Sequence, residues 1–110
     1  MLVDIEDKDV YIFGAGDSLR IWLTRYGKGV NAVCAFDNSK NKWGTKAYGL
    51  EVRPPSELPD RVKRGGEKTR VIIASIYHND ISKQLARMEI NDYYVFMDGL
   101  KYEFRKESKE

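Results

Sequence analysis

The sequence predicts one α/β domain, a three-layer sandwich with a mostly parallel five-stranded sheet between layers of helices. Three observations support this. Short apolar runs alternate with amphipathic stretches of about ten residues, which is typical of βαβ units. The apolar run at residues 10–13 leads into a glycine turn, Gly14-Ala15-Gly16, and then into a segment with helical periodicity. The chain has 110 residues, enough for one domain to bury a core without metal ions or disulfide bonds.

The first βα unit is the clearest part of the pattern. A strand is predicted at residues 9–13, and the helix after the glycine turn places its apolar side chains on one face. They recur at i, i+3, i+4 and i+7: Leu19, Trp22, Leu23 and Tyr26. Gly27 and Gly29 would end this helix. The second strand, residues 31–36, is apolar at nearly every position, which predicts that helices cover both of its faces.

The rest of the chain continues the alternation. We expect a polar loop at residues 38–47, an edge strand at 48–53, a short helix at 57–64, a central strand at 71–75, a helix at 79–89 and a last strand at 93–97. Pro54 and Pro55 would end the edge strand, because proline cannot donate a ladder hydrogen bond. The domain would span residues 1–98, and the charged tail, residues 99–110, would be a surface helix or a linker.

This order of elements predicts where a ligand would bind. Right-handed crossovers favour the strand order 3-2-1-4-5, in which the chain changes direction between the first and fourth strands. Ligands of open α/β sheets bind beyond the carboxyl ends of the strands at such a switch point. We therefore expect a crevice between residues 14–18 and residues 75–79.

The glycine turn and the acid about twenty residues later match the first half of a Rossmann-type nucleotide site. Gly14, Ala15 and Gly16 would approach a diphosphate with their backbone, and Asp37 would accept hydrogen bonds from a ribose. Leu19 stands where the full G-x-G-x-x-G pattern has its third glycine, so the turn indicates the architecture rather than a particular cofactor. The other interpretation of Asp37 is a local turn in which its side chain bonds its own backbone.

Further candidates surround this core of the site. Ser18 would contact a phosphate, although Asp17 and Ser18 could instead cap the helix. Asn38 lies just beyond the second predicted strand and Ser75 ends the fourth, and we include both as ligand contacts.

Other polar residues are less strongly indicated as ligand contacts. Lys40, Lys42 and Trp43 could lie over the crevice, or be solvated lysines and a tryptophan folded onto the surface. His78 is the one histidine of the chain and has no paired carboxylate or cysteine beside it, so acid–base catalysis is not expected. The basic cluster, residues 61–70, would lie at the opposite end of the strands as a solvated face.

Composition narrows the classes of function. The net charge is +2 with acids and bases interspersed, so no nucleic-acid partner is expected. No apolar stretch is long enough to span a membrane. Cys34 is the one cysteine of the chain and lies within an apolar run. Because a disulfide bond needs two cysteines, an internal one is excluded, which suits a reducing compartment. Residues for a metal site are lacking as well. These observations predict a soluble cytoplasmic domain.

Several short motifs occur in a familiar order: YIFGAG at residues 11–16, AFDN at 35–38, KWG at 42–44, GLEV at 49–52, PSEL at 55–58 and VIIAS at 71–75. Together they resemble the small Rossmann-like module of bacterial surface-polysaccharide and nucleotide-sugar biosynthesis, found beside sugar dehydratases, sugar acetyltransferases, glycosyltransferases and methyltransferases. The resemblance implies an accessory domain that binds NAD or a nucleotide sugar, has no catalysis of its own and serves a neighbouring catalytic domain.

Two other functions stay open at this point. The chain could be a fragment of an NAD-dependent nucleotide-sugar oxidoreductase, epimerase or dehydratase. It could also be a structural module without a ligand, which forms a homodimer through an exposed last strand.

Overall fold

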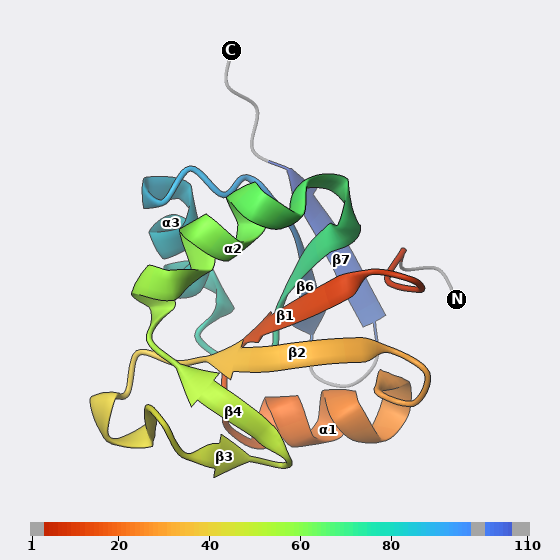
Figure 1. Ribbon diagram of the computed structural model, residues 1–110, viewed down its shortest axis with the longest axis vertical. Coiled ribbons are helices and arrows are strands. Elements are labelled where there is room, and N and C mark those ends of the chain that lie inside the picture. The colour runs from red at the N-terminus through yellow and green to blue at the C-terminus, as the bar shows by residue number, and fades with distance from the viewer. Residues whose placement is uncertain (1–3, 98–100, 107–110) are drawn as a thin grey trace.

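The computed structural model describes residues 4–97 and 101–106. Within them, seven strands form one sheet in the order β3-β4-β2-β1-β5-β6-β7 (Figure 1). The strands are β1 (Asp9–Phe13), β2 (Asn31–Phe36), β3 (Lys46–Ala47), β4 (Leu50–Arg53), β5 (Thr69–Ile73), β6 (Asp92–Met97) and β7 (Lys101–Lys106). The α-helices are α1 (Asp17–Tyr26), α2 (Leu58–Gly65) and α3 (His78–Arg87).

The predicted α/β class is confirmed. Strands β4, β2, β1, β5 and β6 pair in parallel, and their order is the predicted 3-2-1-4-5. The predicted number of strands is wrong, because an antiparallel strand extends the sheet at each edge.

At one edge, part of the predicted loop at residues 38–47 is a strand. β3 pairs with β4 across a two-residue turn in which Tyr48 and Gly49 both have positive φ, at 52° and 89°. This is the backbone that tight hairpins require, and Asn-Gly is its usual sequence. The predicted strand at 48–53 therefore starts at Leu50, and its first two residues make the turn.

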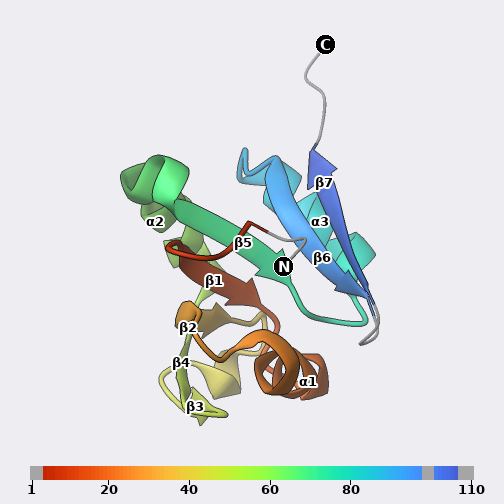
Figure 2. The same ribbon diagram turned by 90° about the vertical axis from the view of Figure 1, so that its right-hand side faces the viewer.

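At the other edge, β7 pairs with β6 over its full length (Figure 2). The expectation of a surface helix or linker is wrong for residues 101–106, which belong to the sheet. Charged residues alternate with Tyr102 and Phe104 in this segment. That period of two is typical of a strand.

Two buried cores cover the two faces of the sheet. Leu19 and Trp22 of α1 pack on one face, and Leu58, Ile81 and Leu85 of α2 and α3 pack on the other. Leu19 is fully buried, so a leucine fills the space that a third glycine of the full pattern would leave between helix and strand.

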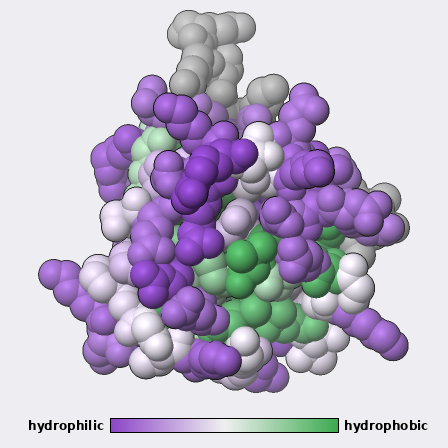
Figure 3. Space-filling view, in the orientation of Figure 1, coloured by the Kyte–Doolittle hydropathy of each residue, from purple (hydrophilic) through white to green (hydrophobic). Residues whose placement is uncertain are grey.

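The expectation that helices cover both faces of the second strand holds for only half of it. Cys34 to Phe36 are buried, but Val33 is 37% exposed. The register of β1 against β2 shifts there, because Ala32 pairs with Val10 and Cys34 with Tyr11. Figure 3 shows apolar side chains at the surface in the region where Figure 1 places β2 and α1.

Candidate functional site

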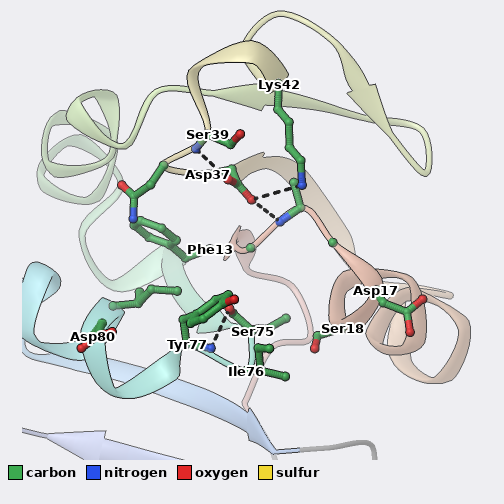
Figure 4. Close-up of a pocket in the computed structure, with 16 residues that line it drawn as sticks. Phe13, Asp17, Ser18, Asp37, Ser39, Lys42, Ser75, Ile76, Tyr77 and Asp80 are labelled. Atoms are coloured by element: carbon green, nitrogen blue, oxygen red, sulfur yellow. Dashed lines mark hydrogen bonds and ion pairs between the residues drawn. The ribbon is translucent and has the colours of Figure 1, made fainter.

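A crevice of about 650 Å³ lies at the carboxyl ends of β1, β2 and β5, at the predicted switch point. Figure 4 shows Asp17 and Ser18 at one end and Asp80 at the other, with Asp37 facing Ser75 and Tyr77 across it. All seven predicted contact residues line this crevice: Gly14, Ala15, Gly16, Ser18, Asp37, Asn38 and Ser75. The structure thus brings the candidates together, and their role in binding stays a prediction.

The two glycines of the turn have different tasks. Gly14 has a φ of 124°, and a Cβ atom there would lie 2.1 Å from the carbonyl oxygen of Ala74. Its N–H donates to the carbonyl of Phe36 at 2.7 Å, so Gly14 bonds the end of β1 to the end of β2, while its backbone lies close to Ala74 at the end of β5. A Cβ atom on Gly16 would meet nothing within 4 Å. Gly14 therefore serves the fold, whereas Gly16 leaves open space in the crevice.

The start of α1 is a second feature of this end of the crevice. Gly16 is the N-cap, and no side chain caps the helix. Asp17 accepts a hydrogen bond from the guanidinium of Arg20 at 2.7 Å, which lowers the pKa of the carboxyl group. The capping interpretation of Asp17 and Ser18 is therefore wrong. The first N–H groups of a helix have no partner within it and carry its positive dipole end, so this end suits an anion.

Asp37 holds the glycine turn in place. Its Oδ2 accepts from the N–H of Ala15 at 3.0 Å, and its Oδ1 accepts from the N–H of Ser39 at 2.8 Å. The local turn that the sequence allowed is thus present. The side chain is 19% exposed, and each carboxylate oxygen can accept more than one hydrogen bond. A contact with a ribose hydroxyl is therefore compatible with the turn.

Two other candidates are engaged within the protein. The side-chain amides of Asn38 and Gln84 exchange two hydrogen bonds of 2.9 Å, which join the loop after β2 to α3. The hydroxyl of Ser75 accepts from the N–H of Tyr77 at 3.0 Å and shapes the loop between β5 and α3.

The loop after β2 contributes one cation to the crevice. Lys42 lines it, with its Nζ 4.0 Å from Oδ2 of Asp37. Trp43 lies outside the lining; its indole N–H donates to the carbonyl of Asp37 at 2.7 Å, and its ring packs on the core beside α1. The interpretation that placed Trp43 over the crevice is wrong, and its hydrogen bond instead anchors the loop. Lys40 is exposed and also lies outside the lining.

The remaining polar candidates lie elsewhere. His78 begins α3 and is not part of the crevice lining. Cys34 is buried, and burial raises the pKa of its thiol, which makes it a poor nucleophile. Residues 61–70 lead into the amino end of β5, away from the crevice, as expected.

No cluster of metal-ligating side chains occurs among residues 4–97 and 101–106. No helix in the described parts of the chain could cross a membrane.

Sequence reasoning missed part of the lining. Asp80 and Ile81 belong to the first turns of α3, and Ile76 and Tyr77 are 79% and 66% exposed. The expected range, residues 75–79, contained Tyr77, but nothing in the sequence distinguished an exposed aromatic ring at the crevice from a buried one.

Comparisons with known proteins support the architecture. No protein-family model and no curated protein matches the chain. UDP-D-quinovosamine 4-dehydrogenase from Vibrio fischeri superposes with a TM-score of 0.65 at 21% identity, over 89% of this chain and 93% of that one. RSP, a Rex-family repressor, was solved with β-NADH and superposes with a TM-score of 0.57 at 21% identity, over 82% of this chain and 46% of that one.

The fold and the comparisons together define a class. The chain has a Rossmann-like α/β fold, an architecture that binds nucleotides at the carboxyl ends of its strands. At these identities the likeness concerns the fold alone. RSP was also solved with β-NAD+ and operator DNA, so the comparisons do not support our expectation that nucleic acid is no partner.

Proposed function

We propose that the chain binds a nucleotide or a nucleotide sugar in the crevice described above. The observation that carries this proposal is the uncapped start of α1 behind Gly16, where a side chain would meet nothing. The N–H groups of Gly14 and Ala15 already donate to Phe36 and Asp37, so the diphosphate would lie against the first N–H groups of α1, with the hydroxyl of Ser18 as a further donor. Asp37 would accept a hydrogen bond from the ribose. An acid in that position disfavours a 2′-phosphate, so NAD fits better than NADP.

The proposed role is that of an accessory module in surface-polysaccharide biosynthesis. The short motifs of the sequence support it, as does the likeness to a dehydrogenase of a UDP-sugar. A neighbouring catalytic domain would supply the chemistry, and the setting would be the cytoplasm. The likeness to a repressor solved with NADH keeps NAD among the candidate ligands. We do not propose a homodimer through β6, because β7 pairs with that edge of the sheet and β6 is not exposed there.

A thermal-shift panel tests the proposal, with NAD, NADP, UDP-sugars and adenine nucleotides as probes. A ligand at 100 times its dissociation constant adds about 2.7 kcal/mol to the free energy of unfolding. At about 4–8 °C per kcal/mol, the midpoint should rise by on the order of 10 °C. If none of these nucleotides moves the midpoint, the proposal is wrong.

The Gly16→Val variant locates the site. Its side chain would enter the open space of the crevice, so the nucleotide shift should disappear while the variant still unfolds cooperatively. Thr24→Ala is the control, because Thr24 is exposed and lies near the other end of α1. A nucleotide that binds Gly16→Val as tightly as the natural chain would show that it binds elsewhere.

A further inference from the structure

The charges that line the crevice oppose an anionic ligand. Asp17, Asp37 and Asp80 contribute carboxylates, and among the described residues Lys42 is the only cation of the lining. Arg20 lies outside the lining but pairs with Asp17 at 2.7 Å and offsets that charge. A diphosphate carries several negative charges and needs positive groups close by. Within the described lining, Lys42 alone can supply a full positive charge.

The backbone around the glycine turn provides only weak compensation. The N–H groups of Gly14 and Ala15 already donate within the protein. The first N–H groups of α1 carry the partial charge of the helix dipole, and the hydroxyl of Ser18 is neutral. A hydrogen bond from a charged group is stronger than one from a neutral group. The affinity for a diphosphate should therefore depend on the lysine.

Lys42 has a fixed backbone and a free side chain. Its N–H donates to the carbonyl of Ser39 at 3.0 Å, and its carbonyl accepts from the N–H of Thr45 at 3.1 Å. The indole of Trp43 ties the same loop to the carbonyl of Asp37. The side chain of Lys42 is 44% exposed, and its Nζ lies 4.0 Å from Oδ2 of Asp37, which is too long for a hydrogen bond.

Asp37 does not need this lysine to hold its place. Its carboxylate already accepts from the N–H groups of Ala15 and Ser39, at 3.0 and 2.8 Å. An ion pair between partly exposed groups contributes little to stability. Because the N–H of Ala15 and the ammonium of Lys42 approach the same Oδ2, the ammonium lies beside the glycine turn (Figure 4). The open space at Gly16 begins one residue further on.

We propose that Lys42 is the phosphate-binding side chain of the crevice, and that its ammonium leaves Asp37 for the diphosphate when a nucleotide binds. The inference rests on the proposed nucleotide binding and adds the residue that selects for phosphate charge. The exchange forms a charge-assisted hydrogen bond and leaves Oδ2 of Asp37 to accept from a ribose hydroxyl. Affinity should therefore rise from nucleoside to diphosphate, and that rise should depend on Lys42.

Lys42→Gln and Lys40→Gln form the matched pair for the test. Both remove one positive charge from the same loop, but Lys40 is exposed and lies outside the lining. Calorimetry on the natural chain first identifies whichever of ADP and UDP binds more tightly. Lys42→Gln should weaken that diphosphate about ten-fold, the order expected for a charge-assisted hydrogen bond. Lys42→Arg should retain most of the affinity, and Lys40→Gln should change it little.

Salt and the uncharged nucleoside separate the effect of charge from the effect of structure. Added sodium chloride screens exposed charges, so it should weaken binding of the diphosphate to the natural chain more than to Lys42→Gln. The nucleoside with the same base should bind the two chains equally. The melting midpoint of Lys42→Gln should match that of the natural chain, because the pair with Asp37 adds little stability.

Equal affinity of Lys42→Gln and the natural chain for the diphosphate, or equal losses in Lys42→Gln and Lys40→Gln, would overturn this role of Lys42 while the proposed function stands. A loss as large for the nucleoside, or an unchanged salt dependence, would show instead that the lysine shapes the loop. A loss confined to NADP would place it at a 2′-phosphate and would also overturn the inference. If neither ADP nor UDP binds the natural chain, the proposed function fails and this inference fails with it.

Discussion

Serine in place of glycine at two positions of one turn should cost much stability at Gly14 and almost none at Gly16. In Gly14→Ser the new Cβ atom would lie 2.1 Å from the carbonyl oxygen of Ala74, at a φ of 124°. Left-handed backbone strain costs about 1–3 kcal/mol, and an overpacked atom costs about as much again. The expected loss is about 2–6 kcal/mol, a large share of the roughly 5–15 kcal/mol that stabilises a typical domain. The melting midpoint should fall by on the order of 20 °C.

Gly16→Ser is the matched control two residues further on. Its Cβ atom would meet nothing within 4 Å, and φ is −106°, which any residue adopts. Serine is a good N-cap, so stability should change by only a few tenths of a kcal/mol, that is about 1–2 °C. Circular dichroism melts of the two variants and the natural chain measure the difference. A Gly14→Ser midpoint within a few degrees of the natural chain, or a Gly16→Ser midpoint below that of Gly14→Ser, would refute the close approach of β1 to β5.

Three further predictions concern the rest of the domain. Leu19→Gly should lower the free energy of unfolding by about 3–6 kcal/mol, because it empties a fully buried position and places glycine in a helix; a urea titration measures this, and a loss below about 1 kcal/mol would contradict the packing. Arg53 donates to Glu57 and lowers the pKa of that carboxyl group below its ordinary value of 4.5, so this stabilisation is present above that pH and is lost as the pH falls through the lowered pKa. The stability difference between the natural chain and Glu57→Gln, followed by urea unfolding at a series of pH values, should therefore shrink on acidification, and a difference that grows would reverse the assignment. A chain that ends at residue 98 should self-associate more strongly than the full chain, because it exposes the edge of β6; light scattering over a concentration series tests this, and identical behaviour of the two chains would disprove it.

Local patterns were sufficient for the central part of the fold. The apolar runs and the spacing of Leu19 and Trp22 predicted the parallel strands and α1, because burial on one or two faces imposes those periods. The edges were harder to predict. The turn at Tyr48 and Gly49 lacks the usual sequence of a tight hairpin, and the period of two in residues 101–106 rests on only two aromatic residues, Tyr102 and Phe104.

The candidate site shows the same division. The glycine turn and Asp37 could be predicted because their sequence separation reflects one βαβ unit, and the crevice lies where the strand order requires. The pairing of Asn38 with Gln84 joins residues 46 positions apart, and no local pattern encodes such a contact. The same holds for the exposure of Tyr77 and for the indole of Trp43, which turns away to anchor a loop.

By itself, the sequence determined the class of fold, the order of the parallel strands and the end of the sheet at which a ligand would lie. These follow from hydrophobic periodicity and from the handedness of crossovers, which act within or between neighbouring elements. Only the tertiary structure decided that Gly14 serves the fold while Gly16 faces open space, and that Asp37 clamps the turn. Those roles depend on how closely β1 approaches β5 and β2, a distance that packing sets and that no single segment of the chain contains.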